Sequence, residues 1–190
     1  MEGYNVVLAD PPWKYKDSVK SRRNGDGTYT RPEGYRSTDH YPSMTLDEMA
    51  GIPVRSMCAD ECVLYMWTTG PNLDVAIELG RRWGFEYKQV AFVWDKVNPV
   101  CGNYTITQCE FVLVFRPKRG RLPKRGKTNA RQHFSEKKRQ HSRKPEYVQD
   151  MLDAMYPDAS KMEMFARRSR EGWDVWGNET DKFDQEGEKE

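Results

Sequence analysis

The chain has 190 residues, of which 37% are hydrophobic, and its 31 Lys+Arg nearly balance its 29 Asp+Glu. This length suits one domain with a substantial core. No apolar stretch approaches the roughly 20 residues of a membrane span, and the N-terminal residues do not resemble a secretory signal peptide. The four cysteines form no C-x-x-C pair, so we expect a reducing, cytoplasmic compartment and no metal site.

The first expected element is a buried strand over residues 4–8, and the run Asp10-Pro11-Pro12-Trp13 follows it closely. Proline removes a donor from the sheet, so the two prolines end the strand. The carbonyls of Asp10 and Pro11 precede residues without an N–H and are free to accept hydrogen bonds from a ligand. Together with the Asp10 carboxylate and the flat face of Trp13, they favour a pocket for a planar group bearing an NH2. A strand terminator with a core tryptophan is the structural alternative.

A long polar segment, residues 14–43, comes next. Its tyrosines alternate with basic residues, a composition that suits stacked bases and phosphates. We interpret it as a lid that contacts the substrate, the alternative being a lid whose tyrosines pack on the body of the domain. The capping box Thr45-Leu46-Asp47-Glu48 predicts a short helix to about Gly51, which would anchor the lid with Tyr41 near the pocket.

Strands and helices alternate in the rest of the chain. Helices are expected over residues 72–83 and 145–155. Apolar runs predict buried strands over residues 62–67, 89–94, 110–115, 162–166 and 173–178. This order indicates a single α/β domain over residues 1–180 with a mostly parallel sheet. Residues 181–190 are acidic and are expected to form a disordered tail.

The near-neutral total charge hides a strong asymmetry. Residues 116–144 contain thirteen Lys/Arg and one acid, Glu136, whereas the rest of the chain carries 18 basic and 28 acidic residues. A basic segment on an acidic body favours a polyanionic partner, and a solvated disordered loop is the alternative. We therefore interpret residues 116–143 as a nucleic-acid-binding loop. Its candidate substrate contacts are Arg116, Lys118 and Arg119.

Taken together, these motifs resemble the DPPW-type adenine amino-methyltransferases. Eukaryotic members of that family methylate adenosine in messenger RNA, and shorter relatives occur in bacteria and phages. The resemblance is carried by Asp10-Pro11-Pro12-Trp13, Tyr41-Pro42-Ser43-Met44, the S-x-K-P segment ending at Pro145, and residues 161–167 followed by 172–179. It implies a Rossmann-like class I methyltransferase fold with helices on both faces of the sheet. The motif order is permuted, because the D-P-P strand comes first and the cofactor half last.

The resemblance also implies the site residues. The catalytic residues would be Asp10, Pro11, Pro12 and Trp13. The contacts to S-adenosylmethionine would be Asp10, Lys144, Phe165, Arg167, Asn178 and Glu179. The substrate contacts would include Trp13, Tyr41, Glu110 and Lys144, in addition to the basic residues above.

The implied reaction is methyl transfer to the exocyclic amine of adenine, with DNA favoured over RNA as substrate. Asp10 and the Pro11 carbonyl would accept both amine hydrogens and so localise the nitrogen lone pair, while Trp13 stacks on the base. A base in a duplex would first have to be extruded. The small surface available for DNA is compatible with a homodimer or a related partner subunit.

Three alternatives stand beside this interpretation. The same chemistry on RNA adenosine is the first, and a non-catalytic, nucleic-acid-binding partner subunit is the second. A nucleotide hydrolase is the third, and it would need a Walker A loop. Five residues separate Gly120 from Gly126, where that loop has four, which argues against the hydrolase.

Overall fold

The computed structural model describes residues 3–14, 22–23, 29–30, 43–101, 104–138, 143–166 and 168–177. Most of the expected lid and the whole acidic tail therefore lie outside the described residues. The helices are α1 (Leu46–Ala50), α2 (Val54–Met57), the 3-10 turn η1 (Gly70–Asn72), α3 (Leu73–Arg82) and α4 (Tyr147–Met155). The strands are β1 (Tyr4–Ala9), β2 (Arg22–Arg23), β3 (Tyr29–Thr30), β4 (Cys58–Thr69), β5 (Phe85–Cys101), β6 (Ile106–Pro117), β7 (His133–Ser135), β8 (Lys161–Met164) and β9 (Asp174–Trp176).

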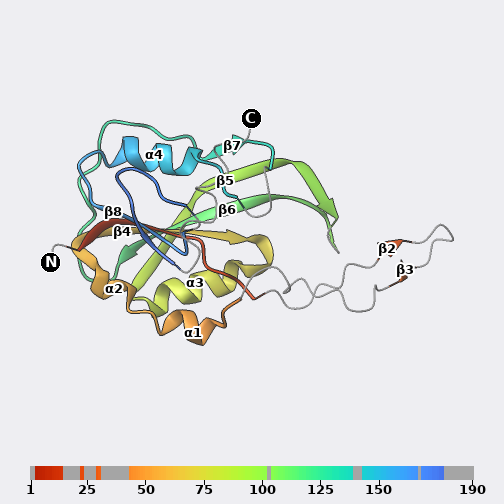
Figure 1. The fold of residues 1–190 in the computed structure, drawn as a ribbon, viewed down its shortest axis with the longest axis horizontal. Helices are drawn as coiled ribbons and strands as arrows, with labels where there is room; N and C mark the ends of the chain where they lie inside the picture. The colour runs from red at the N-terminus through yellow and green to blue at the C-terminus, as the bar shows by residue number, and fades with distance from the viewer. Residues whose placement is uncertain are drawn as a thin grey trace.

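Seven of these strands form one sheet in the order β7-β5-β6-β4-β1-β8-β9 (Figure 1). Strand β1 lies inside it, with β4 and β8 parallel on its two sides. The pairs β5–β7 and β8–β9 are also parallel, whereas β6 runs antiparallel to both β4 and β5. The expectation of a mostly parallel α/β sheet is confirmed. The short strands β2 and β3 pair only with each other.

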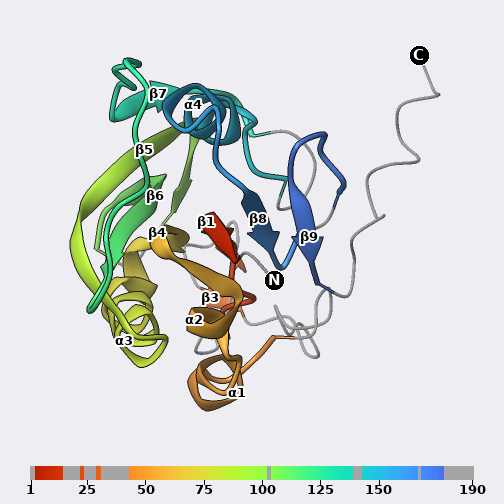
Figure 2. The ribbon, with the colours of Figure 1, turned by 90° about the vertical axis from the view of Figure 1, so that its left-hand side faces the viewer.

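Helices cover both faces of the sheet, as expected. Figure 2 shows α4 on one side and α1, α2 and α3 on the other. Alternate residues of β1 point to opposite faces, because side chains along a strand alternate: Val7 packs with α3, and Leu8 packs with α4. Helix α3 lies close to the sheet at Gly80, where an added Cβ would be 2.3 Å from Cε1 of Phe115 in β6. In the described part of the chain, no helix is long and apolar enough to span a membrane.

The structure extends several expected elements. Strands β4, β5 and β6 extend beyond the apolar runs that predicted them, into sequence that includes polar residues such as Asp60, Glu86 and Thr107. Strand β8 stops at Met164 because Phe165 has a positive φ of 60°, which leaves the extended conformation. The expected helix after Thr45 is confirmed, including both hydrogen bonds of its capping box. Strand β7 and helix α2 were not predicted, since each is too short to show a period.

Candidate active site at the carboxyl edge of the sheet

Because β1, β4 and β8 run parallel, the Asp10 turn lies at the edge of the sheet where all three strands end. Ala9 is the last residue of β1 and pairs with Met66 of β4 and Met164 of β8. We call the edge at which these strands end the carboxyl edge. The antiparallel β6 brings its own beginning to this edge, since Glu110 pairs with Thr69 at the end of β4. In open α/β sheets this edge is the usual place for ligands.

Four charged side chains meet at this edge, and we call them the Asp10 cluster: Asp10, Lys96, Glu110 and Lys144. Lys144 Nζ lies 3.0 Å from Asp10 Oδ1 and 3.4 Å from Glu110 Oε2. Lys96 Nζ lies 3.3 Å from Glu110 Oε1. Three members, Asp10, Glu110 and Lys144, were predicted from the sequence, and the structure brings them together. Lys96 was missed, because it follows a predicted strand as an ordinary solvated lysine would.

Opposite charges balance within the Asp10 cluster. Burial tends to raise the pKa of Glu110, but the ammonium groups of Lys144 and Lys96 outweigh it and hold that pKa below its usual value. Lys144 Nζ also lies 5.6 Å from the ring centroid of Trp67, in reach of a cation–π contact. Glu110 therefore stays charged in a largely buried site because two ammonium groups face it.

The Asp10-Pro11-Pro12-Trp13 turn is held by the backbone. The N–H of Trp13 donates to the Pro11 carbonyl at 2.8 Å, and the N–H of Met44 donates to the Pro12 carbonyl at 3.0 Å. The Pro11 carbonyl, expected to accept a hydrogen bond from a ligand, thus already accepts one from the chain itself, which turns back on it within two residues. A carbonyl oxygen has two lone pairs, so one remains for a ligand. Met44 belongs to the segment expected beside the pocket, whereas Tyr41 lies outside the described residues.

The side chain of Trp13 attaches the turn to the core and to strand β4. Its side chain is only 7% exposed and packs in the core on the α3 side, and its indole N–H donates to the Trp67 carbonyl at 3.2 Å. The expected stacking of Trp13 on a substrate base conflicts with this burial, because core residues cover the ring. The observed contacts assign Trp13 to holding the turn on β4.

We expect Trp13→Phe to lower the free energy of unfolding by about 1–2 kcal/mol, because the substitution removes the N–H bond to Trp67 and leaves a small cavity. Urea unfolding measures this loss. A matched control is Trp176→Phe, at a side chain that is partly exposed in β9. Unchanged stability together with weaker substrate binding in Trp13→Phe would favour the stacking role instead.

Phe165 stands where β8 ends, beside the Asp10 turn. The N–H of Asp10 donates to the Met164 carbonyl at 3.2 Å, so the carboxyl ends of strands β1 and β8 are neighbours. Phe165 holds a left-handed φ of 60° and packs edge-on against Trp176, with ring centroids 5.4 Å apart. Strained backbone of this kind in a non-glycine residue concentrates at ligand sites. Arg167, Asn178 and Glu179, the other expected cofactor contacts, lie outside the described residues.

A buried polar network adjoins the cluster under α4, and the sequence reading missed it. Gln149 Nε2 donates to Glu163 Oε2 at 3.0 Å, and Arg168 donates to Gln149 Oε1 at 3.0 Å and also to Glu146. Burial, and then the charge of Asp10, raise the pKa of Glu163 to about 7. The available signal was an acid between two methionines in an apolar strand.

We expect Glu163→Gln to reduce the pH dependence of stability between about pH 4.5 and pH 7. The folded-state pKa of about 7 exceeds the usual 4.5. In this window the folded protein keeps a proton that the unfolded chain has released, so the free energy of unfolding falls as the pH rises. The fall is on the order of 3 kcal/mol. Urea unfolding of both proteins at about pH 5 and about pH 8 measures it, and equal pH slopes would contradict the assignment.

Three expected substrate contacts lie away from the Asp10 cluster. Arg116 is six residues beyond Glu110 on β6, roughly 20 Å along the strand, and it pairs with Glu86 at 3.7 Å. Lys118 donates its backbone N–H to Gly84, and the carbonyl of Arg119 accepts from Arg55. Because β6 runs antiparallel, it carries Arg116, Lys118 and Arg119 to the edge opposite the Asp10 cluster, so they do not join that cluster. Their expected contact with the phosphates of a nucleic acid stays a prediction.

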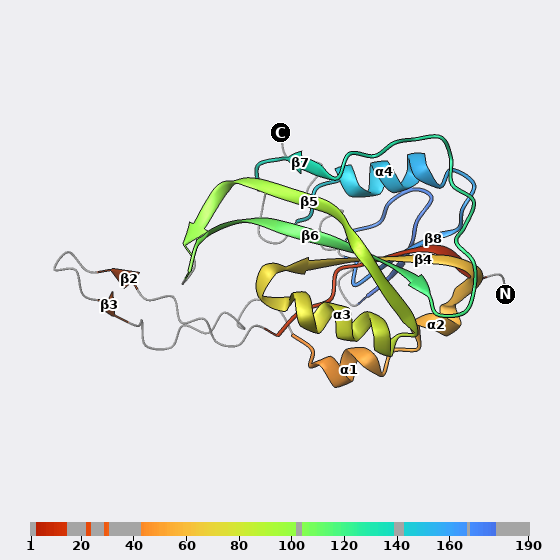
Figure 3. The ribbon, with the colours of Figure 1, turned by 180° about the vertical axis from the view of Figure 1, so that it is seen from behind.

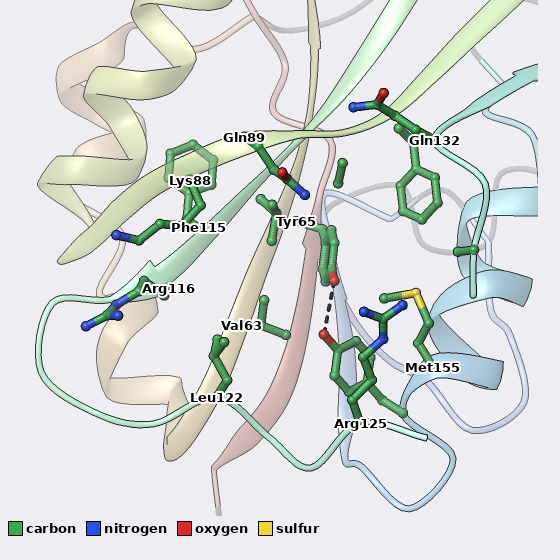
Figure 4. Close-up of a pocket in the computed structure, with 15 residues that line it drawn as sticks. Val63, Tyr65, Lys88, Gln89, Phe115, Arg116, Leu122, Arg125, Gln132 and Met155 are labelled. Carbon is green, nitrogen blue, oxygen red and sulfur yellow. Dashed lines mark hydrogen bonds between the residues drawn. The ribbon is translucent and has the colours of Figure 1, made fainter. Parts of the chain in front are cut away.

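The basic segment then crosses the α4 face, where it covers a cavity of about 710 Å³ (Figure 4). The hydroxyls of Tyr65 and Tyr156 hydrogen-bond at 3.1 Å in this cavity. Figure 4 shows Arg125 beside this pair, and Lys88 with Arg116 at the other end. The segment is tied down by Gly126 N–H donating to the Met155 carbonyl and by Thr128 Oγ1 donating to the Ala154 carbonyl. Among its described residues, β7 and Lys144 return to the carboxyl edge.

Comparisons with known proteins agree with this geometry. A family model, MT-A70, matches residues 4–179. A type II methyltransferase of a Mycoplasma species, M.MunI, is 45% identical over 185 residues, covering 93% of this chain and 77% of that protein. The human N(6)-adenine-specific methyltransferase METTL4 is 24% identical over 197 residues, which is 95% of this chain and 38% of METTL4. The N6-methyladenosine RNA methyltransferase MTA1 of Cryphonectria parasitica is 27% identical, over 96% of this chain and 53% of MTA1.

Proposed function

This chain belongs to the MT-A70 family, and we propose that it transfers a methyl group from S-adenosylmethionine to the exocyclic amine of adenine in DNA. The observation that carries the proposal is the intact Asp10-Pro11-Pro12-Trp13 turn, held at the carboxyl edge with the Asp10 carboxylate beside Lys144 and Glu110. DNA is preferred because the 45% identical relative is a type II methyltransferase, whereas the relative named for RNA is 27% identical. RNA adenosine is the second candidate substrate.

The residues at the edge fit S-adenosylmethionine by their chemistry. This cofactor combines an adenine ring with an ammonium and a carboxylate. Phe165 supplies an aromatic side chain, and Asp10 and Lys144 supply one charge of each sign. The family motif adds Arg167, Asn178 and Glu179. When bound, the cofactor supplies the electrophilic methyl group.

The protein's own part in the reaction is to prepare the adenine nitrogen. The lone pair of this nitrogen is delocalised into the ring, which makes it a weak nucleophile. The Asp10 carboxylate and the remaining lone pair of the Pro11 carbonyl accept its two hydrogens, localise the lone pair and fix its direction. The carboxylate also stabilises the positive charge that develops on the nitrogen and accepts the released proton.

Lys144 orients the Asp10 carboxylate. Its ammonium bridges Asp10 and Glu110, so neither carboxylate can turn away without losing an ion pair. Phosphate contacts are proposed for the part of the basic segment that returns to this edge, where Lys137 and Lys138 are exposed. Such contacts position the nucleic acid without reading its sequence.

Methyl transfer from radiolabelled S-adenosylmethionine tests the proposal, with unmethylated genomic DNA, single-stranded DNA and RNA as parallel substrates. We expect label in adenine of DNA, and mapping the labelled adenines gives the target sequence. Label in RNA alone would select the second candidate. Cofactor binding without label in any substrate would indicate a need for a partner subunit, and absence of both would overturn the proposal.

A further inference from the structure

Strands β5 and β6 form a two-stranded ribbon that extends past the carboxyl edge. Strand β4 ends where Thr69 pairs with Glu110. Beyond that point β6 pairs only with β5, through Cys109–Asp95, Thr107–Val100 and Ile106–Cys101. Figures 1 and 3 show the two strands projecting together beyond their neighbours on the side where β1 and β4 end. The ribbon therefore stands directly beside the Asp10 cluster.

The base of the ribbon is fastened to the site. Between Asp95 and Val100 strand β5 carries extra residues that β6 does not match, which makes a bulge, and bulges set the direction of a strand. Asp95 Oδ1 holds this bulge by accepting the Val97 N–H at 2.8 Å and Gln108 Nε2 at 3.1 Å. Lys96, inside the bulge, reaches Glu110. The ribbon is thus connected directly to the Asp10 cluster through the ion pair between Lys96 and Glu110.

The ribbon carries apolar side chains that are exposed to water. Tyr104 is 100% exposed, Ile106 67% and Val97 42%. These are three of the five exposed large hydrophobic residues in the described part of the chain, the others being Leu122 and Trp176. Residues 96–109 also contain no aspartate or glutamate. A surface without carboxylates approaches phosphates without repulsion, and exposed apolar groups gathered in one place mark a binding surface.

We propose that the tip of this ribbon, Tyr104 with Ile106, inserts into duplex DNA beside the target adenine and fills the gap left when that base turns out toward Asp10. This inference rests on the proposed function. An extruded base leaves a hole in the stack that lies some distance from the catalytic pocket. Ile106 is roughly 14 Å along β6 from Glu110. The tip is therefore separated from the Asp10 cluster, as a side chain that fills the hole left by the extruded base has to be. Apolar side chains wedged between base steps are a recurring way to unstack a duplex.

Tyrosine suits this role because its ring stacks on any neighbouring base. Stacking of this kind is independent of sequence and is lost when the ring is removed. The wedge therefore assists extrusion, while recognition of the target sequence belongs to other contacts. A second copy of the chain is the other occupant that an apolar ribbon could take, and the experiment separates the two.

The test compares Tyr104→Ala and Ile106→Ala with two controls. Tyr104→Phe keeps the ring, and Leu122→Ala removes another exposed apolar side chain, at the opposite edge of the sheet. Each protein methylates two duplexes containing the mapped target, one with thymine and one with an abasic site opposite the adenine. We expect Tyr104→Ala to lose about tenfold or more in kcat/KM on the paired duplex and little on the abasic one, where the base is already free to leave. Tyr104→Phe and Leu122→Ala should behave as wild type on both.

Two further readouts make the result decisive. With 2-aminopurine in the target position, wild type should raise the fluorescence on binding and Tyr104→Ala should raise it less. Equal losses on both duplexes, or no loss, would overturn the wedge. A change from dimer to monomer by light scattering in Tyr104→Ala would assign the tip to a second copy. If wild type methylates neither duplex, the proposed function itself fails. The wedge can still be judged in that case, because the 2-aminopurine fluorescence reports extrusion of the base without methyl transfer.

Discussion

Asp10→Asn should lower kcat for methyl transfer by about 10²–10³-fold while the protein still folds. The substitution keeps the shape of the side chain but replaces a charged acceptor by an amide, so less stabilisation remains for the charge that develops on the adenine nitrogen. Lys144, 3.0 Å from Asp10 Oδ1, also loses its ion pair with Asp10. Single-turnover methylation of DNA by wild type and mutant measures the effect on the chemical step.

The control for this substitution is Asp174→Asn. Asp174 is exposed and accepts a hydrogen bond from Tyr4 in β1, so the change removes a charge from the same sheet but not from the carboxyl edge. It should leave kcat within about twofold, as ordinary surface substitutions do. An Asp10→Asn protein with wild-type kcat would remove Asp10 from the mechanism.

Lys144→Met should lower both activity and stability. It leaves Asp10 and Glu110 facing each other without the shared ammonium, and removing one partner from a buried ion pair costs about 3–5 kcal/mol. We expect a loss of about 10²-fold in kcat/KM as the Asp10 carboxylate loses its orientation. Lys144→Arg, which keeps the charge, should lose less, and Lys137→Met, an exposed lysine of the same basic segment, should keep its stability.

The pH dependence of Lys144→Met follows from Glu110. In wild type the pKa of Glu110 is held below its usual value, so its ion pairs stabilise the fold above the unfolded-state pKa, and that stability is lost as the pH falls through the folded-state pKa. In the mutant the lowering effect of Lys144 is lost and that of Lys96 remains, so the pKa of Glu110 lies higher than in wild type. The stability gap between the two proteins should therefore be large at about pH 7.5 and narrow at about pH 4. A gap that is independent of pH in urea unfolding would contradict the role of Lys144 at Glu110.

The local part of the fold was predictable because it depends on neighbours in sequence. The apolar run before Asp10 and the two prolines after it locate β1 and its end, and the capping box at Thr45 locates α1. The buried network around Glu163 was not predictable in the same way. Its partners, Gln149 and Arg168, come from α4 and from the segment after β8, and only packing brings them together.

The basic residues also show that the sequence alone does not predict where side chains lie in the fold. A charge count marks residues 116–144 as one segment, but β6, the cavity wall and the carboxyl edge each receive a part of it. Arg116 leaves the site on an antiparallel strand, and Lys144 returns to it after the chain has crossed the α4 face. Charge alone does not report that path, because solvated lysine and arginine have the same composition signal wherever the backbone takes them.

By itself, the sequence determined the α/β class, the strand that ends at Asp10 and the identity of three members of the Asp10 cluster. Those follow from hydrophobic period, from proline and from the family motif, all of which are local. Only the tertiary structure decided that β6 runs antiparallel, that Trp13 is buried beneath the turn, that Lys96 joins Glu110, and that a ribbon stands beside the site. The physical reason is that alternation along a strand reports which face is buried, but it is the same for parallel and antiparallel neighbours, so direction and partners depend on the packing of the whole chain.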